Sequence, residues 1–234
     1  MEPLIEAGPS GPPPPLHRMG NPACSAVATP GGVWFESGRI DARVHWRGGW
    51  LRTSYADRMD VGLGWARRRV FGEGLSLEHL VFAPAEPRPL LLGLVALRNS
   101  TDAGVVAEYC ELWEVSGSQP SAAPGACICE TGDGRRALAD AGIAIRARAP
   151  DPLPERGLAL DLRIPLAART TRELSFAYAA PGPNEDPAAL VQGWRGGVRA
   201  ALDSVVAGWL ARLAAAPEPL AAYRDYGDYG NTIG

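Results

Sequence analysis

The sequence predicts a mainly β protein, an antiparallel β-sandwich followed by one long C-terminal α-helix. Short segments in which apolar and polar residues alternate recur between about residues 32 and 180, and this spacing is typical of strands with one buried face. Clusters of glycine, proline, asparagine and aspartate separate these segments, as turns do in a sandwich. After residue 186 the apolar residues recur at steps of three or four, which is helical spacing.

The composition is that of a folded globular protein. Of the 234 residues, 46% are hydrophobic, which is enough for a sizeable core. The formal net charge is −3 and no basic stripe or polybasic patch occurs, so we expect neither nucleic acid nor a membrane as a partner. All 23 basic residues are arginine, which excludes Schiff-base chemistry and a P-loop, because both need lysine. The excess of alanine, glycine, proline and arginine indicates a GC-rich, bacterial genome.

The N-terminus and the cysteines point to the cytoplasm. No basic region followed by an apolar run is present, so no secretory signal is predicted, and the longest apolar stretch, 90–97, is too short to cross a bilayer. We therefore expect a soluble cytoplasmic protein with reduced thiols. Cys127 and Cys129 lack the C-x-x-C spacing, and Cys24 and Cys110 supply no second ligand pair. We expect no metal and no other cofactor.

Four regions follow one another along the chain. We expect a proline-rich lead at 1–20, a β-sandwich domain at 21–182, an amphipathic linker helix at 183–217, and a tail at 218–234 that is the truncated start of a further domain. The lead contains four consecutive prolines, which favour extended polyproline II. The expected strands are 40–46, 50–55, 65–71, 75–82, 90–97, 105–115, 142–148, 158–164 and 172–178, with a short strand at 127–130 inside a long loop at 116–141.

Three of these elements carry the clearest signals. In 40–46 the apolar residues alternate strictly with polar ones, and the glycines at 48–49 then predict a hairpin to the next strand. The stretch 90–97 is almost continuously apolar and predicts a central strand covered on both faces. Asp186 followed by Pro187 predicts a helix start. That helix would run to Pro217 over roughly 45 Å and pack either on the sandwich or on a neighbouring domain.

The densest set of polar groups is the acidic and aromatic segment 108–114. Its carboxylates could act as acid and base or bind a sugar. Glu108 and Glu111, however, are an odd number of residues apart and face opposite sides of a regular strand, so solvated charges are the simpler interpretation. The histidines lack a nucleophile motif such as G-x-S-x-G, and surface ion pairs explain the three arginines at 67–69. We assign no catalytic, cofactor-binding or metal-binding residue.

Tryptophan is the other residue type that points to a ligand. Five tryptophans lie in the β region, and their apolar faces can stack on sugar rings, although core packing is the commoner use. We expect most of them to be buried and Trp50, beside a turn, to be exposed. The candidate sugar contacts are Trp50, Glu111 and Trp113.

Three pieces of the sequence together suggest a family. They are the segment 19–32 that leads into strands, the segment 94–114 with its Asn-Ser-Thr-Asp turn and acidic-aromatic end, and the tryptophan-containing helix at 186–216. Their order resembles the N-terminal super-sandwich of cellobiose-phosphorylase-like glycoside phosphorylases and hydrolases. The resemblance implies a galactose-mutarotase-like β domain joined by a helical linker to an α/α-barrel. The catalytic acid of such enzymes lies in the barrel, so no catalytic residue carries over to this chain.

These observations leave three hypotheses for the function. The first is an accessory domain of a carbohydrate-active enzyme, which shares an oligo- or polysaccharide substrate with a catalytic domain outside this chain and supports a homodimer. The second is a free-standing carbohydrate-binding or protein-interaction module that uses the helix as its partner surface. The third is a small mutarotase-type enzyme that uses a histidine and a glutamate such as His79 and Glu111.

Overall fold

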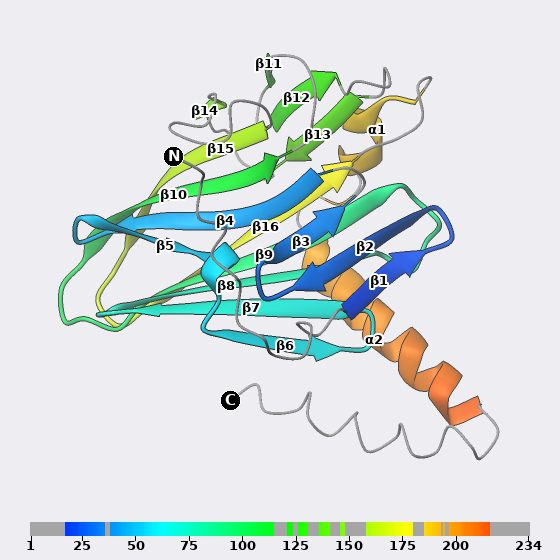
Figure 1. Ribbon diagram of the computed structural model, residues 1–234, viewed down its shortest axis with the longest axis horizontal. Coiled ribbons are helices and arrows are strands. Elements are labelled where there is room, and N and C mark those ends of the chain that lie inside the picture. Colours follow the sequence, from blue (N-terminus) through cyan, green and yellow to red (C-terminus); the bar gives the residue numbers. More distant parts are fainter. Residues whose placement is uncertain are drawn as a thin grey trace, which may run out of the picture.

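The computed structural model describes residues 17–35, 38–114, 121–123, 126–130, 136–140, 146–147, 158–179, 185–192, 194 and 197–215 (Figure 1). In this part of the chain two antiparallel sheets contain eight strands each. Sheet A contains β1 (His17–Asn21), β2 (Cys24–Thr29), β3 (Gly32–Phe35), β4 (Gly38–Trp46), β5 (Gly49–Arg52), β10 (Val105–Glu114), β14 (Arg146–Ala147) and β15 (Leu158–Leu166). Sheet B contains β6 (Arg58–Gly62), β7 (Trp65–Gly72), β8 (Leu75–Phe82), β9 (Leu90–Asn99), β11 (Ser121–Ala123), β12 (Ala126–Glu130), β13 (Arg136–Asp140) and β16 (Thr171–Ala179).

Pairing in the sheets confirms the mainly β, antiparallel class. Sheet A has the order β1-β2-β3-β4-β10-β15-β14, with β5 also paired to β4, and sheet B has the order β11-β12-β13-β16-β9-β8-β7-β6. A 3₁₀ turn, η1 (Thr53–Tyr55), connects β5 to β6. β1 begins at His17, inside the segment expected to be a lead, and residues 1–16 lie outside the described residues.

One hydrophobic core fills the space between the sheets. Strand β4 contributes its alternate residues Ile40, Ala42 and Val44, all fully buried, because successive side chains of a strand point to opposite faces. β9 is buried on both faces, as its continuous apolar sequence predicts. Val95 and Leu97 pack in the core between the sheets, while Leu92 and Leu94 belong to a second cluster on the other side of sheet B.

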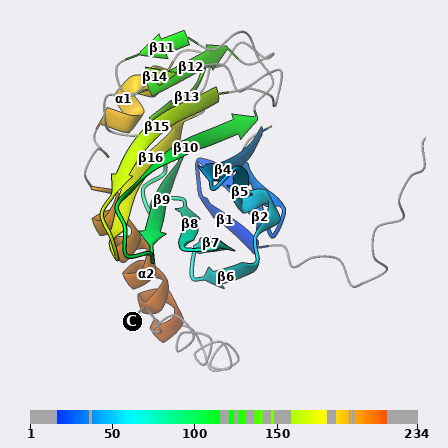
Figure 2. The ribbon, with the colours of Figure 1, turned by 90° about the vertical axis from the view of Figure 1, so that its left-hand side faces the viewer.

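Two helices cover that second cluster. They are α1 (Pro187–Gln192) and α2 (Val198–Ala215), and Figure 2 shows both on the same side of the sandwich, beside β16 and β9. Val198, Leu202 and Val205 of α2 are buried against sheet B. The second half of α2 runs past the strands (Figure 1), and Trp209 there is 37% exposed.

The prediction of one long C-terminal helix is wrong. The chain instead makes turns at Trp194 and Gly197, where Trp194 N–H donates to Val191 O and Gly197 N–H donates to Trp194 O, both at 3.0 Å. Three glycines, at positions 193, 196 and 197, lie at this break, and each costs about 1 kcal/mol relative to alanine inside a helix. α2 begins only after these glycines, at Val198, and has 18 residues. No helix in the described part of the chain is both long and apolar enough to span a bilayer.

Gly64→Ala tests how α2 is seated on the sandwich. Gly64, in the β6–β7 turn, has φ +80°, and a methyl group there would lie 2.6 Å from Trp209 Nε1 and 3.0 Å from Val205 Cγ1. We expect urea unfolding to show a loss of more than the ~1–2 kcal/mol that left-handed backbone alone costs alanine. Gly48→Ala is the matched control, because Gly48 has φ +81° with nothing within 4 Å. Equal losses in the two variants would contradict this seating.

Candidate binding site at the fork of sheet A

β4 is the strand at which sheet A divides. One edge of β4 pairs with β10 along residues 39–45. On the other edge, β3 pairs with β4 as far as Ile40, and β5 pairs with β4 from Arg43 onward. Asp41 and Ala42 therefore face a gap between β3 and β5, which we call the fork.

Thr53, the first residue of η1, fills the fork. Its buried hydroxyl donates to the Asp41 carboxylate and accepts a hydrogen bond from the Ala42 N–H at 2.9 Å. The same N–H lies 2.9 Å from Asp41 Oδ1. Because a buried backbone N–H without a partner is costly, these bonds replace the pairing that a continuous neighbouring strand would supply.

Arg68 reaches the fork from sheet B. Its side chain is fully buried, and its guanidinium donates to Thr53 O at 3.2 Å and to Ile40 O at 3.1 Å. Asp41 Oδ1 lies 3.8 Å from Arg68 Nη1. Burial lowers the pKa of Arg68, and the Asp41 carboxylate, together with Glu111 when it is ionised, acts in the opposite direction. Arg68 thus ties the two sheets together at the point where sheet A divides.

The three consecutive arginines have two different roles. Arg67 and Arg69 form the surface ion pairs expected from the sequence, with Asp60 and Glu78. For Arg68 that expectation is wrong. The alternation of a strand turns the middle residue of the three to the opposite face, and this is the face that sheet A covers.

A hydrogen-bonded network continues from Arg68 to a buried carboxyl. Arg68 Nη2 lies 3.0 Å from His79 Nδ1, and since arginine can only donate, the neutral imidazole carries its proton on Nε2. That Nε2 lies 3.4 Å from Glu111 Oε1 and 3.4 Å from the Tyr178 hydroxyl. The hydroxyls of Tyr109 and Tyr178 both hydrogen-bond to the Glu111 carboxyl.

Burial sets the protonation states in this network. Desolvation raises the pKa of Glu111 from 4.5 to about 8, although its hydrogen bonds from two tyrosines act to lower it. Desolvation and the nearby Arg68 cation hold the pKa of His79 well below 6.5. At pH 7 both groups are therefore neutral, and the buried charges are those of Arg68 and Asp41.

His79 and Glu111 are also the pair named for a mutarotase-type enzyme. They do converge, although they come from β8 in sheet B and β10 in sheet A. The spacing along either strand alone could not show this convergence, because the two residues meet across the core. Both side chains are buried in the core, and all the contacts described for them are with other core residues.

The outer face of sheet A, which points away from sheet B, carries a different set of side chains. Directly opposed residues in an antiparallel pair project to the same face, so the register of β4 with its neighbours identifies them. The opposed pairs at the β3 and β5 edge are Trp34–Arg39, Arg52–Arg43 and Trp50–His45. On the β10 side, His45 is opposed to Glu108, and the two side chains lie 3.7 Å apart.

A pocket of about 350 Å³ opens on this face at the fork, and we call it the fork pocket. Asp41 and Arg43 of β4 line it and are buried, which fixes their position. Trp34 from the β3 side and Tyr55 from η1 line it as well and are 42% and 74% exposed. The pocket combines fixed polar groups with accessible aromatic rings, and both kinds of group occur in small-molecule sites.

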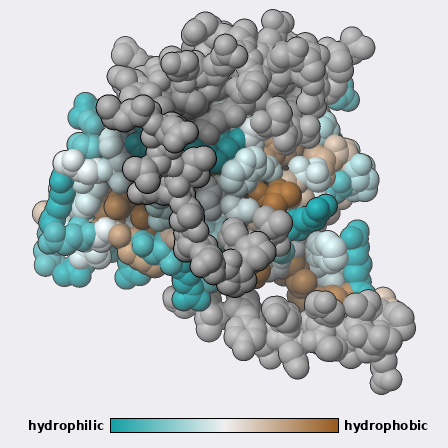
Figure 3. All heavy atoms as spheres, viewed as in Figure 1, coloured by the Kyte–Doolittle hydropathy of each residue, from teal (hydrophilic) through white to brown (hydrophobic). Residues whose placement is uncertain are grey.

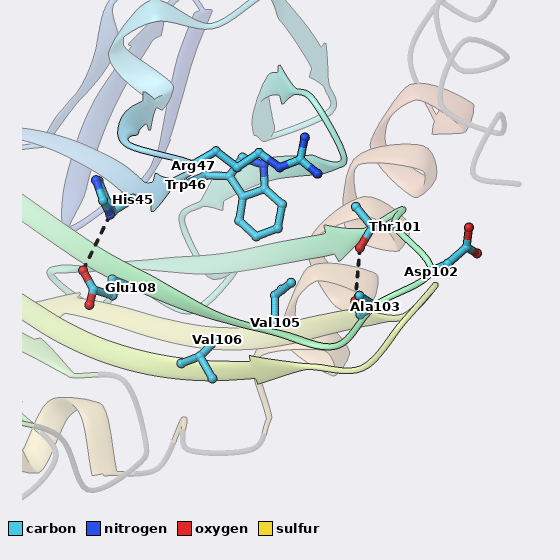
Figure 4. A pocket seen from close by; sticks show the side chains of 9 residues that line it. All are labelled: His45, Trp46, Arg47, Thr101, Asp102, Ala103, Val105, Val106 and Glu108. Carbon is cyan, nitrogen blue, oxygen red and sulfur yellow. Dashed lines mark hydrogen bonds and ion pairs between the residues drawn. The ribbon is translucent and has the colours of Figure 1, made fainter.

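A second hollow, of about 580 Å³, lies at the end of the sandwich and is called the end hollow here. Its lining includes His45, Trp46, Arg47, Val106 and Glu108. Figure 4 shows His45 and Glu108 turned toward each other and the Trp46 ring between the β4–β5 turn and the β9–β10 loop. This end of the molecule, on the left of Figure 3, is mainly hydrophilic with scattered hydrophobic residues.

The three candidate sugar contacts occupy different environments. Trp50 is 40% exposed, as expected, and its ring packs on the Arg43 guanidinium at 4.6 Å and beside the His45 ring at 5.1 Å. Glu111 and Trp113 are buried between the sheets, where Trp113 stacks on Phe35 with ring centroids 5.4 Å apart. Only Trp50 of the three lies on the outer face, and sugar contact by it stays a prediction.

Most of the fork pocket could not be predicted from the sequence. The alternation in 40–46 places Asp41 and Arg43 on one face, but it does not show that β3 and β5 share an edge of β4. The turn is also one residue earlier than expected, at Arg47 and Gly48, both with positive φ (46° and 81°). Correct placement of this turn would have given the Trp50–His45 register from the sequence.

A solved structure shares this fold. It is described as "Putative kojibiose phosphorylase from human microbiome" and matches with a TM-score of 0.53 at 8% sequence identity. The match covers 82% of this chain and 34% of that chain, so this chain spans about a third of its length. At this identity the likeness establishes the fold relationship alone, which the sequence resemblance had implied. No protein-family model and no curated protein matches the sequence.

Thr53→Val tests whether the hydroxyl of Thr53 stabilises the fork. The substitution keeps the shape of the side chain but removes the hydroxyl that donates to Asp41 and accepts from the Ala42 N–H, and it leaves these two groups only their contact with each other. Since a buried hydrogen bond contributes about 0.5–1.5 kcal/mol, we expect a loss of about 1–3 kcal/mol for the two bonds in urea unfolding. Thr53→Ser retains the hydroxyl and should lose clearly less. Equal stability of the two variants would show that the hydroxyl does not hold the fork.

Glu111→Gln tests the protonation state of the buried carboxyl. The folded pKa of about 8 exceeds the unfolded value of 4.5, so the wild-type protein loses stability as pH rises from about 4.5 to about 8. The lowered pKa of His79 changes the stability of the protein only below pH 6.5. Between pH 6.5 and 8 we therefore expect wild-type stability to fall, by at most about 1.4 kcal/mol per pH unit, and the variant to lack this slope.

The control for this experiment is Glu108→Gln. Glu108 is in the same strand but exposed on the opposite face, so its variant should keep the wild-type slope. Unfolding by urea at a series of pH values supplies the comparison. A Glu111→Gln profile parallel to that of the wild type would mean that Glu111 is already ionised in the folded protein at pH 6.5.

Proposed function

We propose that this chain is an accessory β-sandwich domain of a carbohydrate-active enzyme, a glycoside hydrolase or phosphorylase, and that it binds saccharide on the outer face of sheet A. The single observation that carries the proposal is the fork pocket, whose lining combines the buried Asp41 and Arg43 with the accessible rings of Trp34 and Tyr55. The reaction itself would take place on a catalytic domain outside this chain.

The chemistry of the fork pocket suits a sugar. Pyranose rings have apolar faces that pack on aromatic side chains, and their hydroxyls need both donors and acceptors. Trp34 and Tyr55 offer aromatic surface, the guanidinia of Arg43 and Arg52 offer donors in a planar array, and the Asp41 carboxylate offers acceptors. A neutral polyol uses all three kinds of group.

The fold likeness supports the same class. The solved structure that shares the fold is named as a phosphorylase of kojibiose and is about three times longer than the matched region, which covers 34% of it. A domain of this shape can therefore occur inside a larger protein with that name. The projecting half of α2, with Trp209 and Leu210 exposed, offers an apolar surface to a neighbouring domain or a second copy of the chain.

Saccharide binding by the purified chain tests the proposal. Isothermal titration with malto-oligosaccharides, cello-oligosaccharides and kojibiose should reveal binding to at least one of them, and Trp34→Ala should weaken it about tenfold, or ~1.4 kcal/mol. Phe71→Ala is the matched control, because Phe71 is a similarly exposed aromatic side chain, 55% exposed, on sheet B. Binding to none of the sugars, or equal effects of the two substitutions, would overturn the proposal.

A further inference from the structure

Consecutive outward-facing residues of one strand line both hollows of sheet A. Arg39, Asp41 and Arg43 line the fork pocket, and the next outward residue, His45, lines the end hollow. These residues alternate along β4 and so share one face. The two hollows are therefore neighbours along a single strand.

Exposed tryptophans lie at the two ends of this row of outward-facing β4 residues. Trp34 is opposed to Arg39 and Trp50 to His45, and both tryptophans come from strands on the same edge of β4. The two positions on β4 are six residue steps apart, which is roughly 20 Å at the rise of an antiparallel strand. That length corresponds to several linked hexose units and exceeds a mono- or disaccharide.

Trp50 packs on one residue from the lining of each hollow. Its ring covers Arg43, which lines the fork pocket, and packs beside His45, which lines the end hollow. At 40% exposure it keeps aromatic surface for a ligand. A ligand that leaves the fork pocket toward the end hollow therefore passes an accessible indole ring.

The end hollow adds polar groups that a sugar hydroxyl can use. His45 and Glu108 lie 3.7 Å apart with side chains 38% and 60% exposed, so each keeps hydrogen-bonding capacity toward solvent. The Trp46 indole N–H is already used, since it donates to Glu73 O at 2.7 Å. The floor between the hollows is β4 itself, which is held by β10 on one edge and by Thr53 and Arg68 at the fork.

We propose that the fork pocket and the end hollow are two subsites of one linear groove along β4, and that its ligand is an extended oligosaccharide of several hexose units. The inference rests on the proposed function and deepens it, because it specifies the length of the ligand and its direction on the sheet. A rigid row of subsites favours long chains, since each further unit adds contacts after the entropy of association has been lost once.

Chain length and stoichiometry test the groove. Titration of the purified chain with malto- and cello-oligosaccharides of two to six units should show affinity in one series rising at least tenfold from the disaccharide to the pentasaccharide, with one long ligand bound per chain. Trp34→Ala in the fork pocket and His45→Ala in the end hollow should both weaken binding of the same pentasaccharide at least fivefold. Phe71→Ala should leave it within twofold of the wild type.

The outcomes separate this inference from the proposed function. Affinity that does not change with chain length, two pentasaccharides bound per chain, or a loss confined to one of the two groove variants would overturn the linear groove while leaving saccharide binding intact. Absence of binding to any member of either series would overturn the groove and count against the proposed function. Circular dichroism spectra that match the wild type establish that each variant is folded.

Discussion

The buried guanidinium of Arg68 is the interaction on which the rest of this structure depends. A charge removed from water costs several kcal/mol unless good geometry compensates it. Here the compensation comes from both sheets: the carbonyls of Ile40 and Thr53, the imidazole of His79 and the carboxylate of Asp41. Because these groups belong to β4, η1 and β8, satisfying one cation fixes the position of three elements. An apolar residue at this position would leave the fork without its support.

His79 and Glu111, the other half of the network, are compatible with the buried Arg68 cation because both of them are neutral. The core contains Arg68 and Asp41 as a pair of opposite charges, while burial keeps the pKa values of His79 and Glu111 on the side that leaves both uncharged at pH 7. The hydroxyls of Tyr109 and Tyr178 then complete the hydrogen bonds of Glu111. A buried polar network in which most groups are hydrogen-bonded has few alternative arrangements. It therefore favours one registration of sheet A on sheet B over others that an apolar core would allow.

Some of this arrangement could be predicted from the sequence and some could not. Alternation in β4 and the continuous apolar sequence of β9 predicted which residues face the core, because they depend only on the period of a strand. The break between α1 and α2 was missed because the apolar spacing continues through three glycines whose cost was not weighed against it. The burial of Arg68 and its contacts with His79 and the fork were missed for another reason: these partners come from different strands of both sheets, and no local pattern states which strands face each other across a core.

The polar residues of the core and those on the outer face of sheet A differ in the capacity that they keep for a ligand, and this difference is why the ligand site is proposed outside the core. His79 and Glu111 satisfy each other and their neighbours, so they have little capacity left for a substrate. The outer face has the opposite character, with Trp34, Trp50 and Tyr55 only partly covered. Asp41 belongs to both sets, since it lines the fork pocket and also bonds to Thr53 and faces Arg68. The network that holds the sheets together therefore also holds in place a carboxylate that lines the fork pocket, so the proposed binding there would require little reorganisation.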